Sequence, residues 1–263
     1  MADVGELIER AVDLVATAGP TVVFTGAGVS TESGIPDFRS PSGIWARYRP
    51  EDFSFQSFTG SEEGRRRYWA VGRELYGAIR GARPNAGHHA ITALDRLGVL
   101  DCVITQNIDN LHQRAGVGGE KVIELHGNAT RARCLDCGAT CSRDAIQDRL
   151  EAGETLPACS CGGTIKPCTV LFGEAMPANE VALAEQRARA AACFVVVGSS
   201  LVVYPAAYMP LYAKESGARL IIVNLTPTHL DHAADVVIPG RAGEVMARLV
   251  ERLGARRVRQ DRR

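Results

Sequence analysis

Short runs of consecutive apolar residues alternate along this chain with longer segments in which apolar residues recur every three or four positions. The short runs are typical of strands buried on both faces, and the longer segments are typical of amphipathic helices. The predicted strands are residues 21–25, 103–105, 121–125, 194–197, 220–223 and 235–238. The predicted helices are residues 4–18, 61–80, 86–97, 178–192, 206–217 and 242–253. Strands that alternate with helices in this way predict an α/β fold with a Rossmann-like, open parallel sheet.

The alternation stops between residues 128 and 168, where cysteines gather. Two pairs, Cys134 with Cys137 and Cys159 with Cys161, have the residue type and the separation of a tetrahedral four-cysteine zinc site. The second pair is one residue closer than is usual, Cys141 is a competing ligand, and four unrelated thiols are the alternative. Because four thiolates fill the coordination sphere, we expect one structural Zn²⁺.

This pattern divides the chain into three parts. The predicted parts are a Rossmann-like domain of residues 1–127 and 168–253, an inserted zinc module of residues 128–167, and a basic tail of residues 254–263. The tail holds five Arg and one Asp, so it carries +4 while the rest of the chain carries −4. We expect a solvated, frayed terminus there, and an electrostatic docking arm is the alternative.

Composition narrows the class of protein. The chain has 263 residues, of which 46% are hydrophobic and 23% charged, as in globular proteins with a sizeable core. A formal net charge of zero argues against a general nucleic-acid binder. We see neither an apolar run of the roughly 18 residues that a membrane helix needs nor a signal pattern. We therefore expect a cytoplasmic monomer without membrane contact, whose clustered cysteines bind metal in a reducing compartment.

A glycine loop, Gly26-Ala27-Gly28, follows the first predicted strand. Glycines at this point let backbone N–H groups approach a pyrophosphate. A dehydrogenase would also carry an acidic residue at the end of the next strand, about 20 positions further on. Residue 46 is an alanine in a proline-rich loop. The loop thus indicates a nucleotide site that does not serve hydride transfer.

Further polar groups follow other predicted strands. They are residues 106–109, His126, residues 198–200 and Asn224. Ligands bind at the carboxyl ends of the strands in an open parallel sheet, so these groups point to one shared site. Each group alone could instead cap a helix, and His126 alone could be a structural histidine. At a shared site, a neutral imidazole can accept a proton near pH 7.

Taken together, the motifs resemble the sirtuin family of NAD-dependent protein lysine deacylases. The resemblance covers most of the chain, from about residue 20 to residue 245, and its motifs follow one another in family order. The matching segments are residues 26–45, 105–116, 124–127, 170–177, 198–207 and 222–225, together with the two cysteine pairs.

The resemblance implies a role for each matching residue. His126 would be the general base, and Asn107 would assist it while contacting NAD. The remaining NAD-binding residues would be Gly26, Ala27, Gly28, Asp37, Phe38, Arg39, Gln106, Ile108, Asp109, Gly198, Ser199, Ser200, Asn224, Leu225 and Ala242. Val170, Phe172 and Val203 would line an acyl-lysine tunnel. The substrate peptide would add as a strand between Gly173-Glu174 and residues 198–203.

The chemistry that this resemblance implies uses NAD as an activated ribose. Nicotinamide leaves, the acyl oxygen attacks the ribose C1′, and His126 removes a proton from a ribose hydroxyl so that this oxygen attacks the imidate carbon. The products are free lysine, nicotinamide and acyl-ADP-ribose. An apolar tunnel suits a neutral acyl-lysine, because a charged ammonium would lose its hydration there.

Acyl preference and reaction type have alternatives. Family members that remove succinyl or malonyl groups carry a Tyr-x-x-Arg pair, whereas Tyr68 here is followed by Val71 at the arginine position. Without that guanidinium we expect a deacetylase, or a deacylase of neutral chains. A protein mono-ADP-ribosyltransferase using the same NAD site is one rival. A zinc-ribbon module with a nucleic-acid-binding tail is another, and it leaves His126 unexplained.

Overall fold

The computed structural model describes residues 3–260 and contains a large lobe built on a parallel sheet. The sheet has the strand order β3-β2-β1-β7-β8-β9, with all neighbouring strands parallel. Its strands are β1 (Thr21–Thr25), β2 (Leu100–Thr105), β3 (Val122–Glu124), β7 (Cys193–Val197), β8 (Arg219–Asn224) and β9 (Val236–Pro239). Renumbered within this sheet, that order is 3-2-1-4-5-6, the Rossmann order. The predicted fold class is confirmed.

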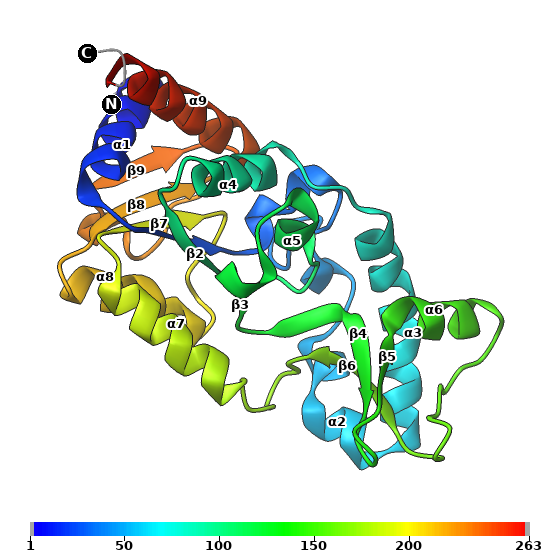
Figure 1. Ribbon diagram of the computed structural model, residues 1–263. Coiled ribbons are helices and arrows are strands. Elements are labelled where there is room, and N and C mark those ends of the chain that lie inside the picture. The colour runs from blue at the N-terminus through cyan, green and yellow to red at the C-terminus, as the bar shows by residue number, and fades with distance from the viewer. Residues whose placement is uncertain (1–2, 261–263) are drawn as a thin grey trace.

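Both faces of the large sheet are covered by helices (Figure 1). Side chains such as Val23 and Val195 lie on one face and pack against helices α1 (Val4–Ala18), α4 (Ala86–Arg96) and α9 (Ala242–Gln260). Side chains such as Phe24 and Phe194 lie on the other face and pack against helices α7 (Ala178–Ala190) and α8 (Met209–Glu215). Successive residues of a strand, such as Val23 and Phe24, point to opposite faces of the sheet. Because helices cover both faces, both residues must be apolar. The uninterrupted apolar runs of the sequence follow from this.

In the large lobe α1, α4, α7 and α8 lie close to predicted helices, α5 (Leu111–Ala115) was not predicted, and α9 ends later than predicted. α1 starts after Asp3, whose carboxylate accepts a hydrogen bond from the Gly5 N–H and so caps the helix. A short 3-10 helix, Ala206–Tyr208, precedes α8. The helices are α1 (Val4–Ala18), α4 (Ala86–Arg96), α5 (Leu111–Ala115), α7 (Ala178–Ala190), α8 (Met209–Glu215) and α9 (Ala242–Gln260).

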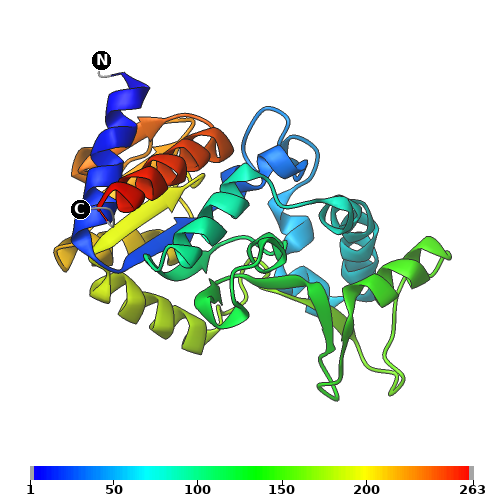
Figure 2. The same ribbon diagram turned by 45° about the horizontal axis from the view of Figure 1, so that its top comes forward.

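A smaller lobe contains an antiparallel sheet with the order β5-β4-β6. Its strands are β4 (Gly127–Cys134), β5 (Thr140–Ser142) and β6 (Ile165–Thr169), and its helices are α2 (Phe55–Gly60), α3 (Glu62–Gly81) and α6 (Arg143–Glu151). A shared core joins residues 128–167 to the two earlier helices through Phe58, Trp69, Ile146 and Leu171. The small lobe thus draws on two separate stretches of the chain, which lie side by side in Figures 1 and 2.

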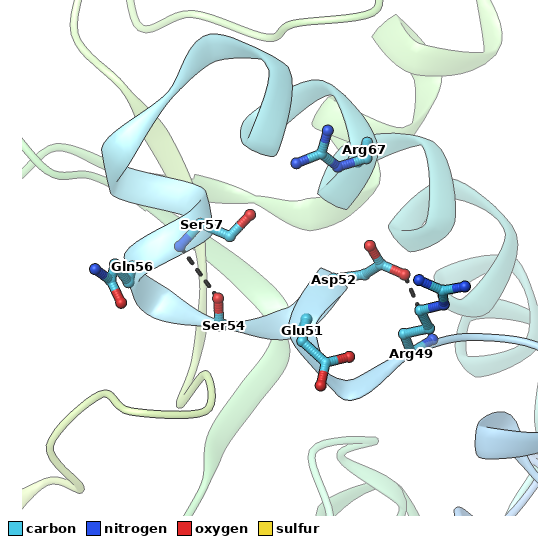
Figure 3. Close-up of a pocket in the computed structure, with 7 residues that line it drawn as sticks. All are labelled: Arg49, Glu51, Asp52, Ser54, Gln56, Ser57 and Arg67. Atoms are coloured by element: carbon cyan, nitrogen blue, oxygen red, sulfur yellow. Dashed lines mark hydrogen bonds between the residues drawn. The ribbon is translucent and has the colours of Figure 1, made fainter.

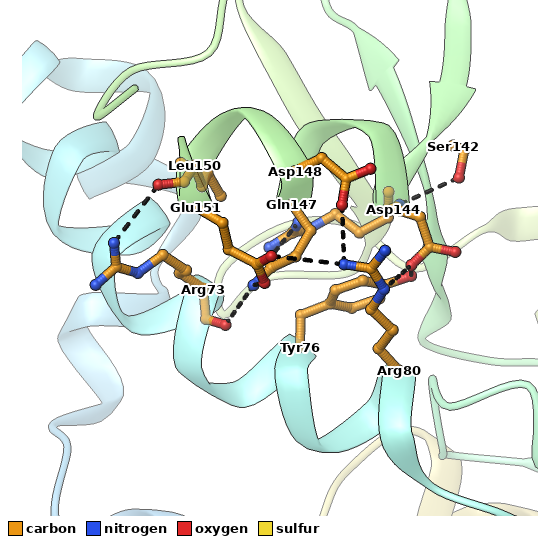
Figure 4. Close-up of polar contacts among 10 residues, drawn as sticks. Arg73, Tyr76, Arg80, Ser142, Asp144, Gln147, Asp148, Leu150 and Glu151 are labelled. Atoms are coloured by element: carbon orange, nitrogen blue, oxygen red, sulfur yellow. Dashed lines mark hydrogen bonds and ion pairs between the residues drawn. The ribbon is translucent and has the colours of Figure 1, made fainter. Parts of the chain in front are cut away.

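A polar and aromatic seam fixes α6 against α3 (Figure 4). The guanidinium of Arg143 is buried and lies 5.1 Å from the ring centre of Trp69 and 4.3 Å from that of Tyr76. The Gln147 amide donates to the Arg73 carbonyl at 2.9 Å. Cation–π contacts of this kind are strengthened by burial, so the seam orients the cysteine-bearing segment relative to α3.

The C-terminal basic residues extend a helix, which corrects the expected frayed tail. α9 continues to Gln260 and does not end near Leu253. Arg256 forms an ion pair with Asp13 of α1, and Arg257 donates to the Leu97 carbonyl after α4. These contacts stabilise the extra turns; residues 261–263 of the tail lie outside the described residues. Within residues 3–260, no helix combines the length and the apolar character needed to cross a membrane.

Candidate functional site

The order of the large sheet reverses between its central neighbours β1 and β7, and ligands bind outside the carboxyl ends of strands at such a point. The glycine loop leaves β1 there, and Gly198 leaves β7. The Gly28 N–H donates to the Gly198 carbonyl at 2.8 Å. A Cβ on Gly28 would lie 2.8 Å from Gly198 Cα, and Gly198 itself has a φ of +63°. Only glycines allow these two turns to approach so closely.

Polar side chains after β2 form a hydrogen-bond network with the glycine loop. The Asn107 amide donates to the Gly26 carbonyl and to Ser30 Oγ, both at 3.1 Å. Ser30 Oγ donates to Asp109 Oδ2 at 2.6 Å, and the Leu111 N–H donates to the other carboxylate oxygen at 2.9 Å. Asp109 is 4% exposed, and this burial raises the pKa of its carboxyl. The network connects Asn107 and Asp109 through Ser30, which the sequence analysis missed.

Two buried histidines lie behind this network, and the sequence analysis missed both. His112 Nε2 lies 2.9 Å from Thr25 Oγ1, which donates to Thr105 Oγ1 at 2.8 Å. His88 Nε2 lies 3.5 Å from Ser30 Oγ. The rings of His88 and His112 are 5.0 Å apart, and burial lowers their pKa to about 4 and about 3. Both are therefore neutral near pH 7, and they contact the network through Thr25 and Ser30.

His126 follows β3 at the same sheet edge. Its Nδ1 lies 2.9 Å from the Gln106 carbonyl oxygen, which can only accept, so Nδ1 carries the proton. Nε2 consequently has a free lone pair. The Gln106 side chain in turn donates to Ser199 Oγ at 2.9 Å, so His126 is connected to the turn after β7. Burial lowers the pKa of His126. A neutral imidazole with a fixed tautomer is what a general base near pH 7 requires.

A segment after β6 carries two of the three expected tunnel residues, Val170 and Phe172, and begins at this edge. The Val170 N–H donates to the His126 carbonyl at 2.9 Å. Phe172 is held on both sides by the main chain of Phe53 and Phe55, at 3.0 and 2.9 Å, yet its side chain is 49% exposed. Its ring lies 5.7 Å from that of Trp45. Val203 is half-buried in the turn after β7.

A wide polar hollow borders this segment but holds none of the expected site residues. It has a volume of about 600 Å³ and lies between the 3-10 helix Pro50–Phe53 and α2, as Figure 3 shows. Its lining residues are Arg49, Glu51, Asp52, Ser54, Gln56, Ser57 and Arg67. Ser54 forms a β-bridge with Phe172, so the hollow adjoins the segment that carries Phe172 on the side of α2.

Other expected NAD residues bond within their own surroundings. Asp37 Oδ1 accepts from the Arg39 N–H at 3.1 Å and from the Ser40 N–H at 2.8 Å, which folds the loop that presents Phe38 and Arg39. Phe38 packs against Trp45, with ring centres 5.3 Å apart. This loop is organised by local bonds, and its side chains Phe38 and Arg39 are exposed.

The remaining expected NAD-binding residues are more dispersed. The Asn224 side chain donates to the Thr226 carbonyl at 2.7 Å, and Leu225 is 69% exposed. Ala242 is buried at the start of α9, and Ser200 is half-buried. Ile108 packs against the cluster that contains the small-lobe residue Ala129, and its apolar side chain adds no polar group to the edge of the sheet. The described contacts join none of these residues to the Asn107 network.

The four cysteines chosen from the sequence converge in the small lobe. Their sulfur atoms all lie within 4.8 Å of one another, so they could hold a metal ion. Cys134 Sγ is 3.7 Å from Cys161 Sγ, and Cys137 Sγ is 3.8 Å from Cys159 Sγ. A tetrahedron with Zn–S bonds of about 2.3 Å has S···S edges of about 3.8 Å, so the thiols fit zinc. Cys141 is outside the cluster that the described residues form.

Comparison with known sequences gives one family. The Sir2 family profile matches residues 26–205. The chain is 47% identical to NAD-dependent protein deacetylase 1 of Bradyrhizobium diazoefficiens, over 92% of this chain and 95% of that protein. It is 44% identical to NAD-dependent protein deacylase 2 of Archaeoglobus fulgidus, over 97% and 98% of the two chains.

Solved structures agree with this result. A structure described as a basis for the mechanism and regulation of Sir2 enzymes is 44% identical, covers 95% of this chain and 98% of its own, and superposes with a TM-score of 0.86. A Sir2 complex with a p53 peptide and NAD⁺ is 37% identical, covers 94% and 99%, and also has a TM-score of 0.86. The expected resemblance is confirmed, and this chain belongs to the Sir2 family.

Proposed function

We propose that this chain is an NAD-dependent protein lysine deacylase, which transfers the acyl group of an acyl-lysine to ADP-ribose and releases nicotinamide. The observation that carries the proposal is His126, whose protonated Nδ1 is bound to the Gln106 carbonyl while Nε2 remains basic at the switch point of the sheet. The names of the relatives support it, since they are deacetylases and deacylases. So does a Sir2 structure with a deacetylated p53 peptide and 3′-O-acetyl ADP-ribose.

The residues at the sheet edge fit NAD. The turn at Gly26–Gly28 suits a pyrophosphate, because its only side chain is the methyl group of Ala27 and the main chain can approach closely. Asn107 and Asp109, held by Ser30, would orient the nicotinamide half together with Gln106. Ser199, Asn224 and Ala242 would contact the adenosine half. Asp37, Phe38 and Arg39 would cover the nucleotide from the exposed loop. Bound NAD supplies a ribose carbon that becomes electrophilic as nicotinamide departs.

His126 acts on this ribose as a general base. The hydrogen bond from Nδ1 fixes the tautomer and the ring plane, and burial lowers the pKa of the ring, so a neutral Nε2 faces the hydroxyl proton without reorganisation. Asn107, tied to the glycine loop, would keep the ribose and the attacking oxygen in register. Positioning of this kind removes much of the entropic cost of the reaction.

The substrate peptide would pair with the exposed main chain at Gly173 and with the turn that contains Val203. Main-chain pairing tolerates many sequences, so we infer acyl-lysine proteins of varied sequence as substrates. The exposed ring of Phe172, with Val170 and Val203, would surround the acyl-lysine. Tyr68 is buried among aromatic rings and Val71 offers no charge, so a second carboxylate on the acyl chain would lack a partner. We infer a preference for acetyl and other neutral acyl groups.

One Zn²⁺ would occupy the cysteine cluster and stabilise the small lobe. Its four thiolates would leave no position for substrate, so the role is structural. Thiolates persist in a reducing compartment, and on this ground we infer a cytoplasmic enzyme. None of the sites assigned above requires a second copy of the chain, and we infer that it acts as a monomer.

The test is mass spectrometry of an acetyl-lysine peptide incubated with NAD. The wild-type chain should remove the acetyl group and form acetyl-ADP-ribose, and His126→Ala should do so at least about 100-fold more slowly, because the general base is lost. A matched succinyl-lysine peptide should turn over about 10-fold more slowly than the acetyl peptide.

The same spectra contain the contrary outcomes. An ADP-ribosyl group added to a protein while acetyl-lysine stays intact would indicate a mono-ADP-ribosyltransferase. Full deacetylation by folded His126→Ala would remove the base from the mechanism, and equal turnover of the succinyl peptide would overturn the acyl preference. His232→Ala, which changes an exposed histidine outside the site, is the matched control and should retain wild-type turnover.

A further inference from the structure

A lysine is buried beside the substrate segment, where the mechanism above does not use it. Lys166 lies on β6, and its side chain is 5% exposed. Its ammonium lies 2.9 Å from Glu174 Oε2, and it donates to the Thr169 carbonyl at 2.5 Å and to the Pro167 carbonyl at 3.2 Å. An ammonium has three N–H donors, so these partners satisfy it completely. A buried charge held in this way fixes the groups around it.

The partners of Lys166 begin and end the segment that carries the substrate contacts. Thr169 precedes Val170, and Glu174 closes a turn in which its N–H donates to the Leu171 carbonyl at 3.0 Å. The Glu174 carboxylate also accepts from the Leu171 N–H at 2.9 Å. Gly173, inside this turn, has a φ of +78°, which favours glycine. One ammonium thus connects both ends of residues 169–174 to the small-lobe sheet.

We propose that Lys166 is a positioning residue for the peptide substrate. Its ion pair with Glu174 sets the turn that exposes Phe172 and Gly173, so the edge to which the peptide adds is held in place before binding. The inference rests on the proposed function, in which the acyl-lysine lies against this segment. It assigns to Glu174 a side-chain role, because its carboxylate points inward to Lys166 and its N–H is used within the turn.

Steady-state kinetics with an acetyl-lysine peptide and NAD test this role. In Lys166→Met we expect the KM for the peptide to rise about 10-fold, while the KM for NAD changes less than about twofold, because the NAD residues lie on other strands. Lys166→Arg keeps the charge and should restore the peptide KM to within about threefold of wild type. Glu174→Gln keeps the volume but removes the charge, and it should raise the peptide KM as Lys166→Met does.

Two controls separate positioning from general stability. Lys214→Met removes another lysine from an ion pair, with Asp235 at 2.7 Å in the large lobe, and should leave the peptide KM unchanged. The double variant Lys166→Met/Glu174→Gln should raise the peptide KM no further than Lys166→Met alone, because both changes break the same ion pair. If Lys166→Met does not fold, Glu174→Gln and the arginine variant still decide the result.

The outcomes are distinguishable from failure of the proposed function. Phe172→Ala removes a side chain that would contact the acyl-lysine, and it should also raise the peptide KM. If Phe172→Ala raises this KM while Glu174→Gln and Lys166→Met only lower the melting temperature, the positioning role is wrong. If Phe172→Ala, Glu174→Gln and Lys166→Met all leave the peptide KM unchanged, the placement of the peptide is wrong as well. If the wild-type chain does not deacylate, the proposed function itself fails.

Discussion

At the scale of single residues, the tautomer of His126 decides what the site can do. The Gln106 carbonyl binds the Nδ1 proton, and burial lowers the pKa of the ring below its ordinary value of 6.5. A base accepts a proton only while it is neutral. The ring is therefore half protonated, and catalysis half lost, only at a pH below 6.5.

We expect kcat/KM for NAD to be independent of pH near pH 8 and to fall along an acid limb whose midpoint lies below pH 6.5. The pH–rate profile of the acetyl-peptide reaction measures this, with enzyme returned to pH 7.5 after each incubation to exclude unfolding. His232→Ala should give the same profile. An acid limb centred above pH 7 would contradict the lowered pKa of His126.

The roles of Ser30, His88 and His112 show what could not be predicted at this scale. Gly26, Asn107 and His126 stand directly after apolar runs, so their position at the sheet edge followed from the pattern alone. Ser30 instead contacts Asp109, and His88 contacts Ser30, and in each case the two residues are far apart in the sequence. Such contacts depend on how α4 and α5 pack against the loop. A polar side chain on an otherwise apolar helical face was the available signal.

At the scale of elements, the parallel strands were predictable and β4, β5 and β6 were not. Strands of the large sheet are buried on both faces and therefore appear as apolar runs. β4 reads GNATRARC, in which Arg131 and Arg133 alternate with small residues, and it resembles a loop. α9 was predicted too short for a related reason. Its last arginines are held by Asp13 and by the Leu97 carbonyl, which lie far away in the sequence.

The small-lobe strands meet at the cysteine cluster, so removing one thiol tests how much of this element depends on metal. We expect Cys161→Ser to lose most of the zinc that the wild-type chain binds and to melt at a lower temperature, since a structural site contributes binding free energy to folding. Cys141→Ser changes a thiol outside the cluster and should keep about one zinc per chain. Elemental analysis and thermal melts measure both. Equal zinc contents in the two variants would contradict the ligand assignment.

At the scale of the whole molecule, two lobes with different architectures share one site. The Rossmann order places the glycine loop, Asn107 and His126 at one edge, and this arrangement could be predicted because topology alone dictates it. The small lobe contributes Phe172 through a segment anchored to Phe53 and to His126. That anchoring depends on α2 and α3 joining the cysteine-bearing segment, which no local pattern in the sequence indicates. The proposed substrate side of the site could therefore be predicted only through family resemblance.

The buried histidine pair makes the stability of the whole fold depend on pH. His88 and His112 have a pKa of about 4 and about 3 when folded and about 6.5 when unfolded, so below pH 6.5 the unfolded state binds more protons. Stability should be constant above pH 6.5 and decline toward pH 5, by about 1 to 2 kcal/mol for each histidine. Urea unfolding at pH 7.5, 6 and 5 measures this before most carboxylates titrate.

His112→Gln removes one titrating group from this pair while keeping a polar side chain behind Thr25 and Thr105. Between pH 6.5 and pH 5 its free energy of unfolding should fall less than that of the wild type. The difference should be the contribution of one histidine, about 1 to 2 kcal/mol. His232→Ala, which removes an exposed histidine, should keep the wild-type slope. Equal slopes in all three proteins would mean that the fold does not hold the His112 ring neutral. A reduced slope in His112→Gln alone would place this pH dependence directly beneath the residues that orient Asn107.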